Sequence, residues 1–218
     1  YTSPPLILAA FLLGIRRVIV EPNVYPGVAN RALSPVADLV FVSFAETAPY
    51  FGSHKTRIVG TPIRREFLEV RAPDSDAQSP TLLVLGGSQG ARSINRAMVA
   101  ALPALIAAHP GLRVIHQTGE RDYEEAAAAY RNIKSAGPPP AQIEVVPFLF
   151  DMPRWFRQAD LIVSRSGATT VAEITACGKP AVLIPFPHAV HGHQERNARV
   201  LERAGAVQMI VDARLSGD

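Results

Sequence analysis

Residues 82–92 have the sequence Leu82-Leu-Val-Leu-Gly-Gly-Ser-Gln-Gly-Ala-Arg92, which is an apolar run, a glycine-rich turn and the start of a helical pattern. A strand that is apolar throughout and precedes a helix is typical of a parallel sheet covered on both faces. In the turn, Gly86 and Gly87 let the backbone approach a ligand, and Ser88 supplies a hydroxyl. The turn is a candidate phosphate site, although neither G-x-G-x-x-G nor a P-loop is present. A plain strand-to-helix turn is the alternative.

The same alternation of strand and helix extends along the whole chain. The expected strands are 17–20, 39–42, 56–59, 82–85, 112–116, 143–146, 161–163, 181–184 and 207–211, and the expected helices include 26–37, 46–51, 91–108 and 120–135. This order predicts an α/β protein with two Rossmann-like, doubly wound units, each built on a parallel sheet.

One segment separates the two predicted units. Residues 71–80, Arg-Ala-Pro-Asp-Ser-Asp-Ala-Gln-Ser-Pro, are polar, contain prolines and have no periodicity, as is typical of a linker. We therefore expect one domain over residues 1–70 and another over 81–218. Because 218 residues amount to about one and a half ordinary domains, we expect the first to be truncated at its N-terminus and the second at its C-terminus.

The composition excludes several classes of protein. With 48% hydrophobic and 19% charged residues, the chain can bury a core, which excludes a disordered protein. The single cysteine, Cys177, excludes an internal disulfide framework and fits a reducing compartment. The formal charge of +3 is spread evenly along the chain, so no basic stripe of the kind that binds nucleic acid is present.

Residues 1–15 carry no charged side chain and include the apolar run 6–13. The run is too short for a membrane-spanning helix, which needs about 20 residues, and it lacks the basic region and cleavage site of a signal peptide. It predicts a short helix buried in the core. A surface that contacts lipid, flanked by Arg16 and Arg17, is the alternative.

A second candidate phosphate site is the turn Ser164-Arg-Ser-Gly-Ala-Thr-Thr170, which follows the expected strand 161–163. Ser166 is a candidate cap for the helix that begins at about Ala168, and N–H groups at a helix start stabilise the charge of a diphosphate. Glu173 lies one helical turn further on, where it can accept hydrogen bonds from a vicinal diol such as a ribose. An acidic residue in the first turn is also simply favourable for a helix.

The third candidate turn, 185–197, contains three histidines and Glu195. A metal could bind there, but the prolines and irregular spacing do not match the regular spacing of a helical zinc site. Gln194 and Asn197, three residues apart at a helix start, favour hydrogen bonds to a polar ligand. The Asp74-Ser-Asp76 pattern, which occurs in some metal-dependent sugar transferases, lies in the linker and is explained by solvation. We therefore predict no metal site.

Together these turns resemble the MurG family of UDP-N-acetylglucosamine transferases, which make lipid II in bacterial cell-wall synthesis. The resemblance rests on five motifs that follow one another along essentially the whole chain. They are Glu21-Pro-Asn-Val-Tyr-Pro-Gly-Val-Ala-Asn30, Gly60-Thr-Pro-Ile-Arg64, Gly86-Gly-Ser-Gln-Gly-Ala-Arg92, Ser164-Arg-Ser-Gly-Ala168 with Glu173, and Pro185-Phe186 with His193, Gln194 and Asn197. Val20, Pro22 and Thr61 differ from the residues usual in the family.

The resemblance implies a GT-B fold, with an acceptor-binding domain before the linker and a donor-binding domain after it. It implies an inverting transfer of GlcNAc from UDP-GlcNAc, as a substrate, to the MurNAc 4-hydroxyl of lipid I. No cofactor and no metal are implied. The residue usually cast as the general base is a His in an N-terminal loop that this sequence does not contain, so no catalytic residue is assigned.

The resemblance also implies which residues bind substrate. They are Asn23, Arg64, Ser88, Leu149, Ala168, Thr169, Thr170, Val171, Glu173, His193, Gln194 and Asn197. In this assignment Leu149 holds uracil through its main chain, Glu173 binds the ribose hydroxyls, and Gln194 binds the GlcNAc hydroxyls. Arg64 is expected to reach the donor from the acceptor-binding domain.

The implied partners are UDP-GlcNAc, lipid I and the cytoplasmic face of the bacterial plasma membrane, where the protein would be peripheral. Other proteins of cell-wall synthesis are further implied partners, whereas nucleic acid is not. Two alternatives stay open. One is another GT-B enzyme of UDP-sugars, such as a glycolipid synthase or a UDP-GlcNAc 2-epimerase, and the other is a nucleotide-sugar binding module without turnover.

Overall fold

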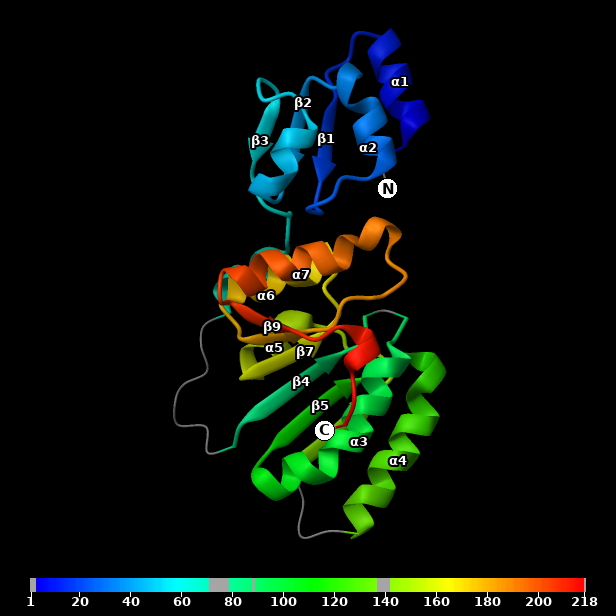
Figure 1. The fold of residues 1–218 in the computed structure, drawn as a ribbon, viewed down its shortest axis with the longest axis vertical. Coiled ribbons are helices and arrows are strands. Elements are labelled where there is room, and N and C mark those ends of the chain that lie inside the picture. The colour runs from blue at the N-terminus through cyan, green and yellow to red at the C-terminus, as the bar shows by residue number, and fades with distance from the viewer. Residues whose placement is uncertain (1–2, 71–78, 88, 137–141, 218) are drawn as a thin grey trace.

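The computed structural model describes residues 3–70, 79–87, 89–136 and 142–217 (Figure 1). Within these residues the strands form two parallel sheets. The three-stranded sheet has the order β1 (Val18–Glu21), β2 (Leu39–Val42), β3 (Thr56–Ile58). The six-stranded sheet has the order β6 (Gln142–Val146), β5 (Arg113–Gln117), β4 (Thr81–Leu85), β7 (Leu161–Ser164), β8 (Ala181–Leu183), β9 (Val207–Met209). The predicted α/β class with parallel sheets is confirmed.

The helices follow the strands in the order expected for crossover connections. The α-helices are α1 (Pro4–Leu12), α2 (Val28–Leu33), α3 (Arg92–Ala108), α4 (Tyr123–Ala136), α5 (Met152–Gln158), α6 (Ala168–Cys177) and α7 (His193–Arg203). Short 3₁₀ segments are η1 (Ser34–Val36), η2 (Ala45–Tyr50), η3 (Arg65–Glu69), η4 (Glu120–Asp122), η5 (Val190–Gly192) and η6 (Asp212–Arg214).

Both faces of the six-stranded sheet are buried, which explains why its central strand is apolar throughout. Along β4, Leu82 and Val84 point to one face and pack in a cluster with residues of α3 and α4. Leu83 and Leu85 point to the other face and pack with residues of α5, α6 and α7. All five residues of β4 are buried. The doubly wound arrangement therefore follows from the pattern of this strand.

The three-stranded sheet has a smaller core. Ile19 of β1 and Val40 and Val42 of β2 pack with Leu33 and Phe51 in one cluster. Helix α2 lies against β1, and α1 lies against α2 and η1. The alternation of buried and more exposed residues in β1 and β2 shows that one face of this sheet is packed and the other is more open.

Two predicted helices differ from the observed elements at prolines. The expected helix 26–37 is divided, because α2 gives way to the 3₁₀ segment η1 at Pro35. The expected helix 46–51 is the 3₁₀ segment η2, which contains Pro49. Proline disfavours the α conformation in the residue before it and removes a backbone donor, so a tighter turn replaces the α-helix at both places.

The expectation that the apolar run 6–13 forms a buried helix is wrong in one respect. The helix α1 forms, but none of its residues is buried, and Leu12 is 83% exposed. Ile7 alone of its residues packs, partly buried, against the core of the first sheet. An apolar run without a polar stripe has no periodicity that indicates which face is packed, so the sequence could not decide its burial.

No helix among the described residues is long and apolar enough to cross a lipid bilayer. Most of the expected linker, residues 71–78, lies outside the described residues. The observed strands of the first sheet end by residue 58 and those of the second begin at residue 81. The domain limits of 1–70 and 81–218 stay a prediction.

Candidate functional site

The two candidate phosphate turns meet at one point of the six-stranded sheet. From β4 the chain adds β5 and β6 on one side and then returns to place β7 on the other side of β4. Connections that leave neighbouring strands in opposite directions open a crevice at the carboxyl ends of those strands. Leu85, which precedes the glycine turn, is the register partner of Ser164, which begins the second turn. The two turns therefore lie side by side at the carboxyl edge of the sheet.

A cavity of about 200 Å³ opens at this crevice. It is lined by the ends of β4, β5 and β7, by the loop before α5, by the start of α5 and by the first two turns of α6. Its lining residues are Leu85, Gly87, Gln117, Phe148, Leu149, Met152, Ser164, Arg165, Thr170 and Glu173. Leu149, Thr170 and Glu173 had been predicted as site residues from the sequence, and the fold brings them to one cavity.

The glycine turn after β4 packs directly against the turn after β5. Gly90 has a φ of +77° and Gly119 a φ of +81°, in the region that favours glycine. A Cβ on Gly90 would collide with the carbonyl oxygen of Thr118, and a Cβ on Gly119 would lie 2.6 Å from the Gly90 backbone. Because these two glycines carry no side chain, the two backbones can lie in direct contact. Gly87, in the same turn as Gly90, lines the cavity. Ser88, the predicted diphosphate contact, lies outside the described residues.

Helix α6 begins at the rim of the cavity. The residue before it is Gly167, and the first N–H that donates back into the helix is that of Val171, 2.9 Å from the Gly167 oxygen. The N–H groups of residues 168–170 have no acceptor within the helix, so they are available to an anion. The prediction that Ser166 caps this helix is wrong. Its hydroxyl instead donates a hydrogen bond of 2.9 Å to the carbonyl oxygen of Gln194.

Glu173 is partly buried, and burial raises the pKa of its carboxyl group. The positive charge of Arg64 acts in the opposite direction and lowers the same pKa. The Arg64 guanidinium lies over the ring of Phe67, 5.1 Å from the ring centroid. Arg64 directly precedes η3, and η3 packs on α6. The expected approach of Arg64 to the donor side thus has a structural basis, while its role in binding stays a prediction.

Gln117 is a site residue that the sequence reasoning missed. Its side-chain N–H donates to the carbonyl oxygen of Gly87 at 2.9 Å, and its Oε1 accepts from the N–H of Leu149 at 3.3 Å. The side chain is buried and links the glycine turn to the loop predicted to hold uracil. A polar residue that ends an otherwise apolar strand beside the switch point was the available signal.

Arg165 was also missed, although it belongs to one of the motifs. Its guanidinium donates to the carbonyl oxygens of Ile184 and Pro185, each at 3.1 Å, and to Ser93 Oγ at 2.9 Å. It also forms an ion pair with Asp212. One side chain therefore fixes the turn after β7 to the turn after β8, the start of α3 and η6.

Asn197 joins the second unit to the first. Its Oδ1 accepts from the N–H of Val24 at 3.0 Å, and its Nδ2 donates to Asn23 Oδ1 at 3.1 Å and to the Ser166 oxygen at 3.4 Å. The side chain is fully buried. Asn23 and Asn197 thus contact each other between the units, and their assignment to substrate stays a prediction.

Glu21, another residue without a predicted role, orients Asn23. Its carboxylate is buried and accepts from the backbone and side-chain N–H groups of Asn23, from the N–H of Gly27 and from Asn30 Nδ2, at 2.8–3.2 Å. Four donors satisfy a carboxylate that would otherwise be costly to bury. The carboxylate therefore holds the loop that contacts Asn197.

Gln194 and His193 lie at the start of α7. The Oε1 of Gln194 accepts from the N–H of Phe186 at 2.9 Å. His193 Nδ1 lies 2.8 Å from the carbonyl oxygen of Val190, which can only accept, so Nδ1 carries the proton in this contact. Among the described residues, the Gln194 side-chain NH₂ has no hydrogen-bond partner. This donor is therefore available to a ligand.

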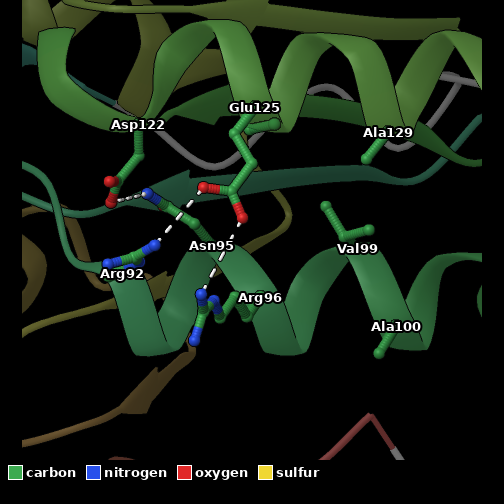
Figure 2. A pocket seen from close by; sticks show the side chains of 9 residues that line it. Arg92, Asn95, Arg96, Val99, Ala100, Asp122, Glu125 and Ala129 are labelled. Carbon is green, nitrogen blue, oxygen red and sulfur yellow. Dashed lines mark hydrogen bonds and ion pairs between the residues drawn. The ribbon is translucent and has the colours of Figure 1, made fainter.

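A second cavity, of about 170 Å³, lies between α3 and α4, away from the switch point. Figure 2 shows that Arg92 and Arg96 of α3 both reach the carboxylate of Glu125 on α4, at 3.6 and 3.9 Å. Val99 and Ala129 face each other further along the groove. Because its charges compensate one another and no predicted site residue lines it, this groove is a helix packing contact rather than the candidate site.

A comparison with known families matches the part of the chain that contains this cavity. The model of the glycosyltransferase family 28 C-terminal domain matches residues 81–218, the range that contains the six-stranded sheet and its cavity. The chain belongs to glycosyltransferase family 28.

Curated relatives extend the similarity of this family 28 chain to the residues before 81. Proteins of Geobacter sulfurreducens and Thermodesulfovibrio yellowstonii are 46% and 43% identical to it over 100% of this chain and over 59% and 60% of their own lengths. Each is named "UDP-N-acetylglucosamine--N-acetylmuramyl-(pentapeptide) pyrophosphoryl-undecaprenol N-acetylglucosamine transferase". The chain thus spans about 60% of the length of these relatives.

Solved structures agree with the family 28 assignment. The crystal structure of Acinetobacter baumannii MurG matches with a TM-score of 0.80 and 35% identity, over 100% of this chain and 59% of that one. The resemblance to the MurG family and the GT-B fold are confirmed. A UDP-GlcNAc 2-epimerase of Neisseria meningitidis matches with a TM-score of 0.62 at 14% identity, over 94% of this chain and 60% of that one, which shows a shared fold.

The prediction that the chain has no metal site depends partly on residues outside those that the structure describes. Among the described residues of this family 28 chain, no group of three or more His, Cys, Asp or Glu side chains could hold a metal ion. Asp74 and Asp76 lie outside the described residues. Transfer without a metal or cofactor stays a prediction.

Proposed function

We propose that this chain takes part in the inverting transfer of GlcNAc from UDP-GlcNAc to the MurNAc 4-hydroxyl of lipid I, which forms lipid II. The observation that carries the proposal is the cavity at the β4–β7 switch point, where the glycine turn, the start of α6 and Glu173 come together. The printed names of relatives that are 43% and 46% identical support both the donor and the acceptor.

In this proposal the diphosphate binds between the glycine turn and the start of α6. The N–H groups of residues 168–170 offer neutral donors and the positive end of the helix, worth about 0.3–2 kcal/mol for a nearby negative charge. The same donors stabilise the charge that develops on UDP as it leaves. A metal is not needed for this step, because fixed backbone dipoles supply the positive potential. The general base that deprotonates the acceptor hydroxyl is not assigned to a residue.

The nucleoside lies deeper in the cavity. Glu173 accepts hydrogen bonds from the ribose hydroxyls, with its carboxylate charge supported by Arg64. Uracil lies against the main chain of Leu149, whose loop Gln117 fixes to the glycine turn. The sugar extends toward the start of α7, where the Gln194 NH₂ can donate to a GlcNAc hydroxyl.

The acceptor is a lipid, so the proposal includes a peripheral position at the cytoplasmic face of the plasma membrane. Helix α1 and the residues after it present exposed apolar side chains, among them Leu12, Leu13 and Ile15. Arg16 follows directly, whereas Arg17 lies over the ring of Phe11, 5.1 Å from its centroid, and is paired with Asp38 at 2.8 Å. An apolar surface beside the basic Arg16 suits an interface with anionic lipid. Contacts with other proteins of cell-wall synthesis at this surface belong to the same proposal.

The test of the donor site is a calorimetric titration of the chain with UDP-GlcNAc. Glu173→Ala removes hydrogen bonds to a charged acceptor, each worth about 1.5–3 kcal/mol, so we expect about a 10- to 100-fold loss of affinity. Glu124→Ala, an exposed carboxylate on α4, is the matched control and should bind as the original chain does. Unchanged affinity in the Glu173 variant would remove the ribose contact from the proposal.

Two further measurements separate the alternatives. Equal binding of ADP- and UDP-sugars would contradict the uracil assignment at Leu149. Turnover assays distinguish the reactions, because a transferase consumes UDP-GlcNAc only with the MurNAc acceptor, whereas a 2-epimerase acts on the donor alone. A binding module without turnover would bind UDP-GlcNAc and do neither.

A further inference from the structure

A third cavity, larger than the donor cavity, lies between the two units. Its volume is about 470 Å³, within the range of about 300–1,000 Å³ usual for ligand sites. Val24, Glu46 and Tyr50 line it from the first unit, and η5 and α7 line it from the second. Figure 1 shows α7 lying across the end of the second unit that faces the first. None of the predicted substrate-binding residues lines this cavity.

The wall that α7 contributes is rich in arginine. Arg196, Arg199 and Arg203 are spaced three and four residues apart, so they lie along one face of the helix, and all three line the cavity. Arg199 is paired with Glu195, at 2.6 Å. Among the described residues, Arg196 and Arg203 have no carboxylate partner. Two guanidinium groups therefore face the cavity without a compensating charge on the helix.

The opposite wall fixes the position of one of these groups. The Arg196 guanidinium lies over the ring of Tyr25, 4.9 Å from its centroid, and that ring also contacts Tyr50 and His191. Glu46 is the acidic side chain that the first unit contributes. The lining thus has three guanidinium groups against two carboxylates, an excess of positive charge that favours an anionic ligand.

We propose that this cavity binds a free carboxylate of the peptide carried by the acceptor, an inference that rests on the proposed function. The relatives' name states that their acceptor bears a pentapeptide. Planar guanidinium groups bind carboxylates through two parallel hydrogen bonds, which suits Arg196 and Arg203. The cavity extends to Gly192, which directly precedes His193 and Gln194, so a peptide in it lies beside the sugar that is transferred.

The dimensions agree with this occupant. Arg203 lies seven positions after Arg196, which is about 10 Å along a helix at 1.5 Å per residue. Five residues of extended peptide span at most about 17 Å. A pentapeptide can therefore run along α7 and still place its terminal carboxylate at either arginine.

The test uses two soluble probes, N-acetylmuramyl-pentapeptide and the same glycopeptide with a carboxamide at its C-terminus. Calorimetric titration of the chain should give about tenfold weaker binding of the carboxamide, since one charged hydrogen bond is lost. The double variant Arg196→Gln with Arg203→Gln should bind the carboxylate probe at least tenfold more weakly and no longer distinguish the two probes. Arg203→Gln alone, which loses no contact with the described residues, should show part of this loss. Arg96→Gln on α3 is the control and should behave as the original chain.

Each outcome decides the proposal. Equal affinity for the two probes, no binding of either probe, or an unchanged double variant would overturn it. A parallel titration with UDP distinguishes this failure from failure of the proposed function, because the donor cavity shares no lining residue with the cavity at α7. UDP binding that persists in every variant also shows that the variants fold. If the original chain does not bind UDP, the proposed donor site itself is contradicted.

Discussion

At the scale of single residues, the least expected feature is a buried polar network behind the glycine turn. His116 is fully buried in β5, with Nδ1 2.7 Å from the Tyr130 hydroxyl and Nε2 3.0 Å from Asn95 Oδ1. Asn95 Nδ2 donates to Asp122 and to the Thr118 oxygen, so Oδ1 is the acceptor and His116 Nε2 carries the proton. Nδ1 then accepts from the Tyr130 hydroxyl. In the neutral form, both ring nitrogens of His116 therefore have a hydrogen-bond partner. Burial lowers the pKa of His116 to about 4.

This network predicts a dependence of stability on pH. In the unfolded chain the pKa of His116 is its ordinary value near 6.5, above the folded value of about 4. The unfolded state therefore binds a proton first as the pH falls, and the free energy of unfolding decreases between about pH 6.5 and pH 4. The loss is about 3 kcal/mol across that window.

Urea denaturation at pH 7 and at pH 4.5 measures this loss. His116→Gln retains a donor and an acceptor but does not titrate, so its free energy of unfolding should fall less over the same interval. Equal falls in the two proteins would show that other groups cause the acid sensitivity.

At the scale of elements, α1 shows how far an apolar pattern can be interpreted. Proline at the first two helical positions and helix-forming residues after it explain why the helix forms. Helix α1 has few neighbours, and its main contacts are with α2 and η1. The run of exposed leucines is therefore a candidate interaction surface rather than part of the core.

Membrane binding tests that surface. Changing Phe11 and Leu12 together to Ser removes two exposed apolar side chains, at about 1.5–3 kcal/mol each when fully buried in lipid, so co-sedimentation with anionic liposomes should fall at least tenfold. Leu68→Ser, which changes an exposed leucine in η3, is the control and should leave sedimentation unaltered. If the double variant still sediments fully, α1 is not the lipid contact.

At the scale of the whole molecule, Asn197 couples the two units. Its three hydrogen bonds join α7 to the loop after β1 and to the turn after β7. The Cys177 thiol adds a contact of 3.4 Å to the carbonyl oxygen of Phe67, which belongs to η3. Asn197 therefore links the loop after β1, which lines the arginine-lined cavity, to the turn after β7, which lines the donor cavity.

Asn197→Ala should loosen this coupling. The Val24 N–H loses its acceptor, and a net hydrogen bond is worth about 1 kcal/mol, so amide hydrogen exchange at Val24 should accelerate about fivefold. Asn132→Ala, an exposed residue of α4, is the control. Unchanged exchange at Val24 in the Asn197 variant would show that this contact does not hold the units together in solution.

The sequence by itself determined the strands, their order along the chain and the turns that we propose as phosphate sites, because each depends on local pattern. An apolar run such as residues 82–85, of strand length and followed by glycines, is typical of a strand buried on both faces, and the glycines after it favour a turn whichever fold encloses them. The family could be identified from the same turns. Ser166 was misassigned because capping was the only role that local geometry offered.

Only the tertiary structure decided which side chains share a site. Gln117 acquires its role because β5 lies beside β4, which brings its amide between Gly87 and Leu149. Asn23 and Asn197 are 174 positions apart, and nothing local indicates that they form a hydrogen bond. The exposure of α1 depended on which elements pack against it. Contacts between distant segments depend on the packing of the whole chain, so periodicity and turn chemistry cannot specify them.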